Sequence, residues 1–302
     1  MKKTKFLSIL LAVLLILAVG CEPSVGVPKT IKIASWNIEN FGKSKATDEQ
    51  KMRAIAAILK NYDIIVVQEI SNVKETSDPG CPRNENACPG HKDCDLIKKA
   101  LEKYLNDENG LHYRLVFSPQ VKDERYLFIY NPDKATLEES NLVNDPGDSK
   151  PICATNPAKT GKMVRQPFKG RFKAGKFDFV LLTVHTSPAK NVKELEGLEY
   201  FYTETEKEVE PDIIILGDLN ADCNYLKPSD HIVLKNEGYI WTVSDDSDTT
   251  VSGTDCAYDR FIFKSPTAED FTGNWGVYKE ITADISDHYL IWAEFWTEKD
   301  TD

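Results

Sequence analysis

Two short apolar runs constrain the fold of this sequence more than any other feature. Ile64-Ile65-Val66-Val67 and Ile213-Ile214-Ile215-Leu216 are uninterrupted and almost entirely β-branched, which is typical of strands buried on both faces. Five other stretches predict further strands, over residues 31–36, 126–130, 177–184, 258–263 and 289–295. Many strands with few, spaced helices indicate an α/β or α+β layered domain.

Two stretches predict helices. The first has a capping-box pattern over residues 47–50, with Thr47 as the cap, and an apolar face that continues to Leu59. The second has its apolar positions within 192–202. The chain has no linker between residues 30 and 297, so this stretch is predicted to form one domain.

The first residues have the composition of an export signal. A basic start over residues 2–5 is followed by an apolar run that ends at Gly20-Cys21. We therefore predict a lipoprotein-type signal peptide over residues 1–20, a lipid anchor on Cys21 and a short tether over residues 21–29. The alternative is an ordinary signal peptide cut near Gly20. Both predict export, either to the outward face of a bacterial envelope membrane or into the medium.

Seven cysteines in an exported chain indicate disulfides, and six remain when Cys21 is set aside. Three lie in an insertion rich in Pro, Gly and Asn over residues 78–94, one lies alone in a later loop, and two lie beside motifs described below: Cys81, Cys88, Cys94, Cys153, Cys223 and Cys256. The pairing of the first four does not follow from the sequence. Three cysteines near His91 also allow a zinc site, but a disulfide-stapled loop is favoured in an exported protein.

The formal net charge of -11 bears on the class of partner. An acidic surface repels a polyanion, because phosphate binding commonly uses Lys and Arg. The composition therefore argues against tight, static binding of nucleic acid. It argues less against an enzyme whose carboxylates hold a divalent cation, since the cation supplies local positive charge.

Nine polar residues lie beside or just beyond predicted strands: Asn37, Glu69, Glu124, His185, Asp218, Asn220, Asp259, Asp287 and His288. Because an unpaired buried carboxylate is costly, so many such residues predict one shared site that neutralises a cation. Oxygen ligands from Glu, Asp and Asn suit Mg²⁺, Mn²⁺ or Ca²⁺ rather than zinc. Two histidines can transfer protons near neutral pH. The pattern predicts metal-assisted attack of water on a phosphodiester.

Eight motifs follow one another in a set order: Ser35-Trp36-Asn37-Ile38, Val67-Gln68-Glu69, Glu124-Arg125-Tyr126-Leu127-Phe128, His185-Thr186-Ser187-Pro188, Gly217-Asp218-Leu219-Asn220-Ala221-Asp222-Cys223, Asp248-Thr249-Thr250, Cys256-Ala257-Tyr258-Asp259-Arg260 and Ser286-Asp287-His288-Tyr289. Together they resemble the deoxyribonuclease I family of the endonuclease/exonuclease/phosphatase superfamily. The resemblance covers nearly all of the chain beyond the predicted signal. It implies a four-layered α-β-β-α sandwich, with two packed mixed sheets flanked by helices.

The resemblance also implies a metal and phosphate site. Carried over by motif position, Asn37 and Glu69 would hold the catalytic Mg²⁺ or Mn²⁺. Asp218, Asn220 and Asp287 would complete the pocket for metal and phosphate.

Two histidine–acid pairs are implied as well, His185 with Glu124 and His288 with Asp259. One histidine would activate water and the other would protonate the leaving 3′ oxygen, with His288 assigned as the base and His185 as the acid. The products would carry 5′-phosphates.

Further roles follow from the same motifs. Arg165 matches the phosphate-contacting arginine of the family, and Cys223 and Cys256 match its structural disulfide. Four residues fall where the family binds a structural Ca²⁺: Asp248, Thr250, Ser252 and Thr254. Outside these roles, Trp36 and Tyr258 are interpreted as core aromatics.

Three positions depart from the family pattern. Two arginines that enter the minor groove of DNA are replaced by Glu39 and Ser71, and a tyrosine that packs on deoxyribose is replaced by Lys122. These changes weaken the expected grip on duplex DNA without changing the chemistry. Lys43 and Lys45, together with Lys122, are candidates to compensate.

Three functions are weighed. The first is a secreted or lipid-anchored endonuclease, a monomer that cuts DNA, expected to be duplex, with weak sequence preference. The second is a related phosphodiesterase that acts on RNA or phospholipid head groups, because fold does not determine substrate. The third is a lipid-anchored binding protein without activity. It is disfavoured because none of the nine site residues is missing.

Overall fold

The computed structural model describes residues 29–71, 92–143, 163–208, 210–236 and 238–300. Several predicted features lie outside these residues: the signal peptide, the lipid anchor at Cys21, nearly all of the tether, and Cys81, Cys88 and Cys153. Among the helices that the structure describes, none is long and apolar enough to cross a membrane.

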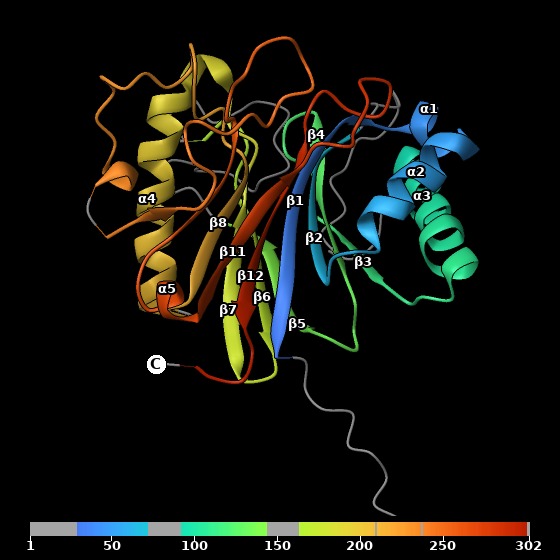
Figure 1. The fold of residues 1–302 in the computed structure, drawn as a ribbon, viewed down its shortest axis with the longest axis horizontal. Coiled ribbons are helices and arrows are strands. Elements are labelled where there is room, and N and C mark those ends of the chain that lie inside the picture. The colour runs from blue at the N-terminus through green and yellow to red at the C-terminus, as the bar shows by residue number, and fades with distance from the viewer. Residues whose placement is uncertain (1–28, 72–91, 144–162, 209, 237, 301–302) are drawn as a thin grey trace, which may run out of the picture.

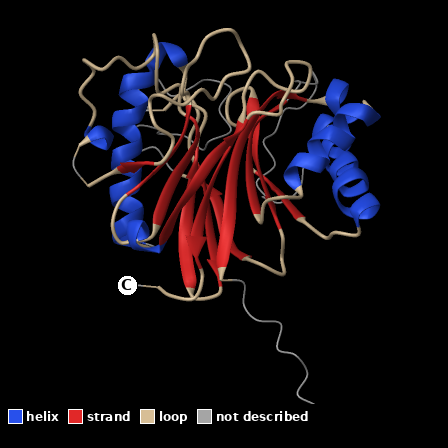
Figure 2. Cartoon of the chain, in the orientation of Figure 1, coloured by secondary structure: helices blue, strands red, loops and turns tan. Residues whose placement is uncertain are grey.

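Two six-stranded sheets form the centre of the molecule (Figures 1 and 2). The first has the order β11 (Phe271–Tyr278), β12 (Leu290–Trp296), β1 (Thr30–Phe41), β2 (Ile64–Ser71), β4 (Glu124–Tyr130), β3 (Arg114–Phe117). The second has the order β5 (Thr136–Leu142), β6 (Phe168–Ala174), β7 (Phe177–Thr183), β8 (Ile213–Asp218), β10 (Asp259–Phe263), β9 (Ile240–Trp241). Each sheet is mixed, with one parallel pair: β1 with β2, and β7 with β8.

Helices cover the outer faces of both sheets (Figure 2). The first sheet is covered by α1 (Lys43–Ala46), α2 (Glu49–Leu59) and α3 (Lys92–Leu101), which continues through η1 (Glu102–Asn106) and η2 (Asp107–Asn109). On the side of the second sheet lie η3 (Pro188–Lys190), α4 (Asn191–Glu208), η4 (Val233–Lys235) and α5 (Thr267–Asp270). The layers are therefore helix, sheet, sheet and helix, and the predicted α-β-β-α sandwich is confirmed.

The two apolar runs are continuous because each serves two cores. On β2, Ile64 and Val66 point into the core between the sheets, whereas Ile65 and Val67 pack against the first helix layer. On β8, side chains alternate in the same way between the inter-sheet core and the core under α4. A strand with a hydrophobic layer on each face needs apolar residues at every position.

The start of α2 differs from the prediction. Its N-cap is Asp48, whose carboxylate accepts a hydrogen bond of 3.1 Å from the backbone nitrogen of Lys51. Thr47 instead donates its hydroxyl to the carbonyl of Lys43 at 2.9 Å. Thr47 is therefore wrong as the predicted cap, because its hydroxyl serves the last turn of α1 and Asp48 is an equally good cap.

One disulfide joins two of the described segments. Cys223, in the loop after β8, is bonded to Cys256, which lies just before β10 and 33 residues further along the chain. The pairing implied by the family resemblance is thus present. Cys94 is buried on α3 and is also disulfide-bonded, to a partner outside the described residues.

At the end of β8, the backbone of Gly217 lies very close to the backbone of Val184. Gly217 has a φ of +143°, a conformation that other residues rarely adopt. A Cβ added there would clash with the carbonyl oxygen of Val184, just beyond β7. A glycine is therefore required immediately before Asp218.

We expect Gly217→Ala to lower the free energy of unfolding on the order of 3 kcal/mol, because backbone strain and overpacking add at this position. Gly110→Ala is the matched control, since Gly110 also has a positive φ, +64°, but no atom lies within 4 Å of its added Cβ. The control should cost about 1 kcal/mol. If urea unfolding gave the same loss of unfolding free energy for both variants, the clash with Val184 would not be the cause of the loss.

Cys223→Ser should lower the melting temperature, because it frees a 33-residue loop in the unfolded chain. A loop of this size corresponds to roughly 3–4 kcal/mol of stability. Cys256→Ser and the double variant should melt at the same temperature as the single variant, since all three break the same bond. If the melting temperature of the double variant fell by the sum of the two single decreases, the Cys223–Cys256 pairing would be contradicted.

Candidate active site

The polar residues singled out in the sequence meet at one edge of the sandwich. Strands of both sheets begin or end there, so residues far apart in the chain converge. The first sheet contributes Asn37 on β1, Glu69 on β2, Glu124 on β4 and His288 just before β12. The second contributes His185 just after β7, Asp218 at the end of β8 and Asp259 at the start of β10.

Asp218 lies at the centre of this group and is almost fully buried. Its Oδ2 accepts a hydrogen bond of 3.1 Å from Asn37 Nδ2 and lies 3.5 Å from Nε2 of both His185 and His288. Burial alone would raise the pKa of Asp218, but His288 and His185 outweigh it and lower the pKa. Two imidazoles thus face one carboxylate oxygen.

His185 is held from behind by Glu124. Its Nδ1 lies 3.0 and 3.1 Å from the two carboxylate oxygens of Glu124, so Nδ1 carries a proton and Nε2 faces Asp218. Burial would lower the pKa of His185, but the negative charges of Glu124 and Asp218 outweigh it and raise the pKa.

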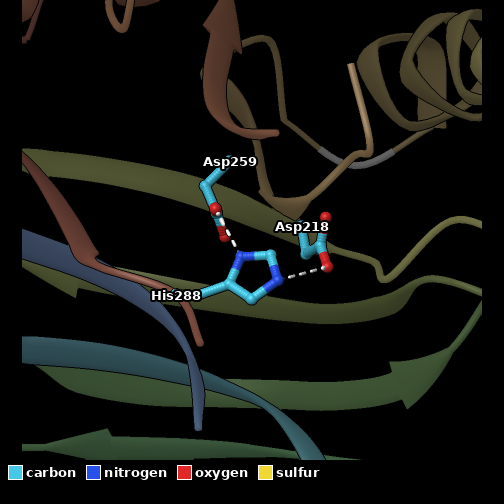
Figure 3. Close-up of side chains that lie close together, drawn as sticks. All are labelled: Asp218, Asp259 and His288. Atoms are coloured by element: carbon cyan, nitrogen blue, oxygen red, sulfur yellow. Dashed lines mark hydrogen bonds and ion pairs between the residues drawn. The ribbon is translucent and has the colours of Figure 1, made fainter. Parts of the chain in front are cut away.

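His288 has the same arrangement with Asp259 (Figure 3). Its Nδ1 lies 2.8 Å from Asp259 Oδ2, while Nε2 points to Asp218. Burial would lower the pKa of His288, but Asp259 and Asp218 raise it to about 10. Burial raises the pKa of Asp259 despite the nearby imidazole. Each histidine therefore has one nitrogen fixed by an acid and the other presented to the site.

The donors around Asp218 fit a divalent cation. Asn37 Nδ2 donates to both Asp218 and Glu69, at 3.1 and 3.0 Å, so one amide brings two carboxylates together. Ligand atoms of Asp218, Asp259 and His288 also lie within 4.8 Å of one another. Carboxylate oxygens are ligands that Mg²⁺, Mn²⁺ and Ca²⁺ prefer, and Asp218 and Glu69 supply them, whereas the Oδ1 of Asn37 accepts from Glu39. The residues present therefore suit such an ion.

A left-handed turn within β1, just after Asn37, contacts Glu69. Glu39 and Asn40 have positive φ values of 25° and 49°, and Glu69 has a φ of 57°. The turn lets the backbone nitrogen of Asn40 donate to Glu69 Oε2 at 2.9 Å, and that of Glu39 donate to Asn37 Oδ1 at 3.0 Å. Residues in this region of φ are costly and commonly occur at functional sites.

Lys45, a candidate to compensate for the lost DNA contacts, is not free at the surface. Its ammonium is buried and donates to the carbonyls of Ile38, at 3.1 Å, and Glu39. It also lies 3.8 Å from the Glu39 carboxylate, and burial lowers its pKa. The prediction that Lys45 compensates for lost DNA contacts is therefore wrong, because its charge is used inside the turn. Lys43 and Lys122 are exposed.

Three other predicted site residues occupy the border of the group. Asp287 is exposed, with Oδ1 3.9 Å from His288 Nε2. Asn220 is buried and donates its amide to the carbonyl of Thr186 at 3.1 Å. Arg165 lies behind His185: it donates to the His185 carbonyl at 3.2 Å, and its Nε is 3.3 Å from Glu124.

The segment predicted to bind Ca²⁺ forms a compact turn of polar side chains. Asp248 Oδ1 accepts from both the backbone nitrogen and the hydroxyl of Thr250 at 3.0 Å. The hydroxyls of Ser252 and Thr254 lie 2.6 Å apart. Four predicted ligand residues are thus close together.

Tyr258 was predicted to be a core aromatic, and this prediction is wrong. It is only half-buried, not a core residue, and its ring lies 6.3 Å from that of His288 and 5.4 Å from that of the exposed Tyr225. Its position directly before Asp259 is the sequence signal that could have placed it at the site. Trp36 is fully buried as predicted, and its indole donates to the His288 carbonyl at 3.0 Å.

Comparison with known proteins agrees with this geometry. The Endonuclease/Exonuclease/phosphatase family profile matches residues 34–288. The chain is 29% identical to deoxyribonuclease-1 of Oryctolagus cuniculus over 304 residues, covering 93% of this chain and 97% of that protein. It is 28% identical to deoxyribonuclease gamma of Homo sapiens, covering 93% and 90%.

A solved structure shows the same fold. An endonuclease/exonuclease/phosphatase family protein from Bacteroides thetaiotaomicron has a TM-score of 0.60 at 16% identity, covering 90% of this chain and 99% of that one. The family profile spans most of the chain and includes all nine site residues. The chain therefore belongs to the endonuclease/exonuclease/phosphatase family, as a hydrolase of the deoxyribonuclease I type.

Proposed function

We propose that this protein is an exported, lipid-anchored, metal-dependent endonuclease that hydrolyses DNA and leaves 5′-phosphates. The observation that carries the proposal is the presence of two acid-backed histidines, His185 and His288, whose Nε2 atoms face the same oxygen of Asp218 at 3.5 Å. Such a pair supplies one base and one acid at a single point, as hydrolysis of a phosphodiester requires.

The residues divide the chemistry between them. A bound Mg²⁺ or Mn²⁺, held by Asn37 and Glu69 with Asp218, Asn220 and Asp287 alongside, would supply positive charge to the phosphate and weaken the pull of Asp218 on the histidine protons.

The two histidines then act in opposite directions. His288 takes a proton from the attacking water at Nε2, and Asp259 stabilises the imidazolium that forms. His185 gives its Nε2 proton to the 3′ oxygen as the P–O3′ bond breaks, while Glu124 fixes its ring. The phosphate remains on the 5′ oxygen of the downstream fragment, and the upstream fragment ends in a 3′ hydroxyl.

The names of the similar proteins support DNA as the substrate, since the relatives matched over about nine-tenths of their length are deoxyribonucleases. Glu39 favours a second candidate. A carboxylate stands where the family inserts an arginine into the minor groove, and Lys45 lies 3.8 Å from it. Hydrolysis of RNA or a phospholipid head group by the same residues is the alternative.

Further parts of the proposal concern the rest of the chain. Residues 30–297 form the catalytic domain, and a monomer is held by lipid at Cys21. Arg165 contacts a substrate phosphate, and Ca²⁺ binds the turn over residues 248–254. The Cys223–Cys256 disulfide is in keeping with an oxidising compartment outside the cytoplasm.

His185→Ala and His288→Ala should each reduce nicking of supercoiled plasmid in Mg²⁺ by roughly 100- to 10,000-fold, because each removes a proton-transfer group. His112→Ala is the control, since His112 is exposed and contacts only Asp133 among the described residues. Cleavage by both site variants at the rate of the control would refute the mechanism. If the parent protein cuts no plasmid, RNA and phospholipid diesters are to be tried with the same preparation.

Glu69→Ala should raise the Mg²⁺ concentration needed for half-maximal rate by about tenfold or more, because it removes a carboxylate from the cation site. Isothermal titration of Mg²⁺ should show the same loss of affinity without substrate. Asp133→Ala serves as control, because Asp133 is an exposed carboxylate in the turn after β4, at the end of the strand opposite to Glu124. Unchanged Mg²⁺ affinity in Glu69→Ala would remove Glu69 from the site.

A further inference from the structure

Thr249 is a fully buried residue that lies between the two segments carrying His288 and Asp259. Its backbone nitrogen donates to the carbonyl of Cys256 at 3.0 Å, and its carbonyl accepts from the backbone nitrogen of Tyr289 at 2.8 Å. Thr249 is therefore hydrogen-bonded both to the segment that leads into Asp259 and to the segment that carries His288.

The Thr249 hydroxyl makes as many hydrogen bonds as a hydroxyl can. It donates to the carbonyl of Cys256 at 3.2 Å and accepts from the backbone nitrogens of Tyr258, at 2.9 Å, and Asp259, at 3.2 Å. One donor and two lone pairs are the full capacity of the group. These bonds hold the chain at the point where it enters β10 and presents Asp259.

The segment around Thr249 is also bound to the segment that carries His288. Thr250 and His288 form an antiparallel bridge, and the backbone nitrogen of Val251 donates to the carbonyl of Asp287 at 2.8 Å. With the Tyr289 bond, three successive residues are paired along this ladder. The distance between the two halves of the histidine–acid pair is thus set through Thr249.

The Asp259 carboxylate has few other restraints. Its Oδ2 meets His288 Nδ1 at 2.8 Å, whereas its buried Oδ1 has no hydrogen-bond partner within the part of the chain that the structure describes. The orientation of the carboxylate therefore depends on Thr249, whose hydroxyl fixes the backbone of Asp259 and also interacts with its carboxylate. Misplacement of a catalytic group by about 1 Å can cost on the order of 100-fold in rate.

From these contacts we infer that Thr249 is a positioning residue for catalysis, whose hydroxyl keeps Asp259 in register with His288. The inference rests on the proposed function, since it assigns His288 the role of base. It goes further by naming a residue outside the pair that controls its geometry.

Three variants of Thr249 and one control at another residue separate the effect of the hydroxyl from that of the rest of the side chain. Thr249→Val has the same shape without the hydroxyl, and Thr249→Ser keeps the hydroxyl without the methyl group. Thr242→Val is the matched control, because Thr242 is also buried and its hydroxyl has no hydrogen-bond partner among the described residues. Thr249→Ala provides a second hydroxyl-free variant if the valine is not accommodated.

The first measurement is proton NMR of the exported protein. The low-field signal of the His288 Nδ1 proton, assigned by its loss in His288→Ala, should shift or broaden in Thr249→Val and be restored in Thr249→Ser. Thr242→Val should leave it unchanged. This comparison needs no turnover, so it decides the positioning role even if the parent protein cuts no phosphodiester and the proposed function fails.

The second measurement is the kinetics of plasmid nicking. Thr249→Val should lower kcat about tenfold or more with KM changed less than about twofold, because positioning acts on the chemical step. Thr249→Ser should recover most of the rate. The inference is overturned if Thr249→Val keeps the NMR signal and kcat of Thr242→Val, or if Thr249→Ser falls as far as Thr249→Val.

Discussion

The site depends on one contact across the sandwich, the approach of both histidines to the buried Asp218 carboxylate. Each histidine–acid pair is shared between the sheets. His185 follows a strand of the second sheet and is held by Glu124 of the first, whereas His288 comes from the first sheet and is held by Asp259 of the second. The geometry of the two pairs is therefore a product of the inter-sheet core, and any change in the spacing of the sheets moves both pairs.

Much of this arrangement could be predicted from the sequence. The runs at 64–67 and 213–216 specify strands with a hydrophobic layer on each side, and a polar residue directly after such a strand has to lie at the edge of a sheet. That reasoning places Glu69 and Asp218 correctly. The pairing of particular histidines with particular acids came from the resemblance to a family, since spacing along the chain does not determine it.

The predictions that failed did so for separate physical reasons. Lys45 was expected on the surface, but a left-handed turn at Glu39 and Asn40 leaves carbonyl groups that a nearby ammonium can satisfy. Thr47 and Asp48 are both good caps, and only the position of the preceding short helix decides between them. Thr249 belongs to one of the eight motifs, but nothing in that motif reveals the three hydrogen bonds of its buried hydroxyl.

The order of the strands along the chain determines when the site can form during synthesis. Strands β1 to β4 belong to the first sheet, β5 to β10 belong to the second, and the chain then returns to add β11 and β12 beside β1. His288 lies in that last segment, just before β12. Strands β1 to β11 are therefore all synthesised before His288, so His288 can reach Asp218 only after most of both sheets has been made. The approach of both histidines to Asp218 is thus completed only when β12 has paired between β11 and β1.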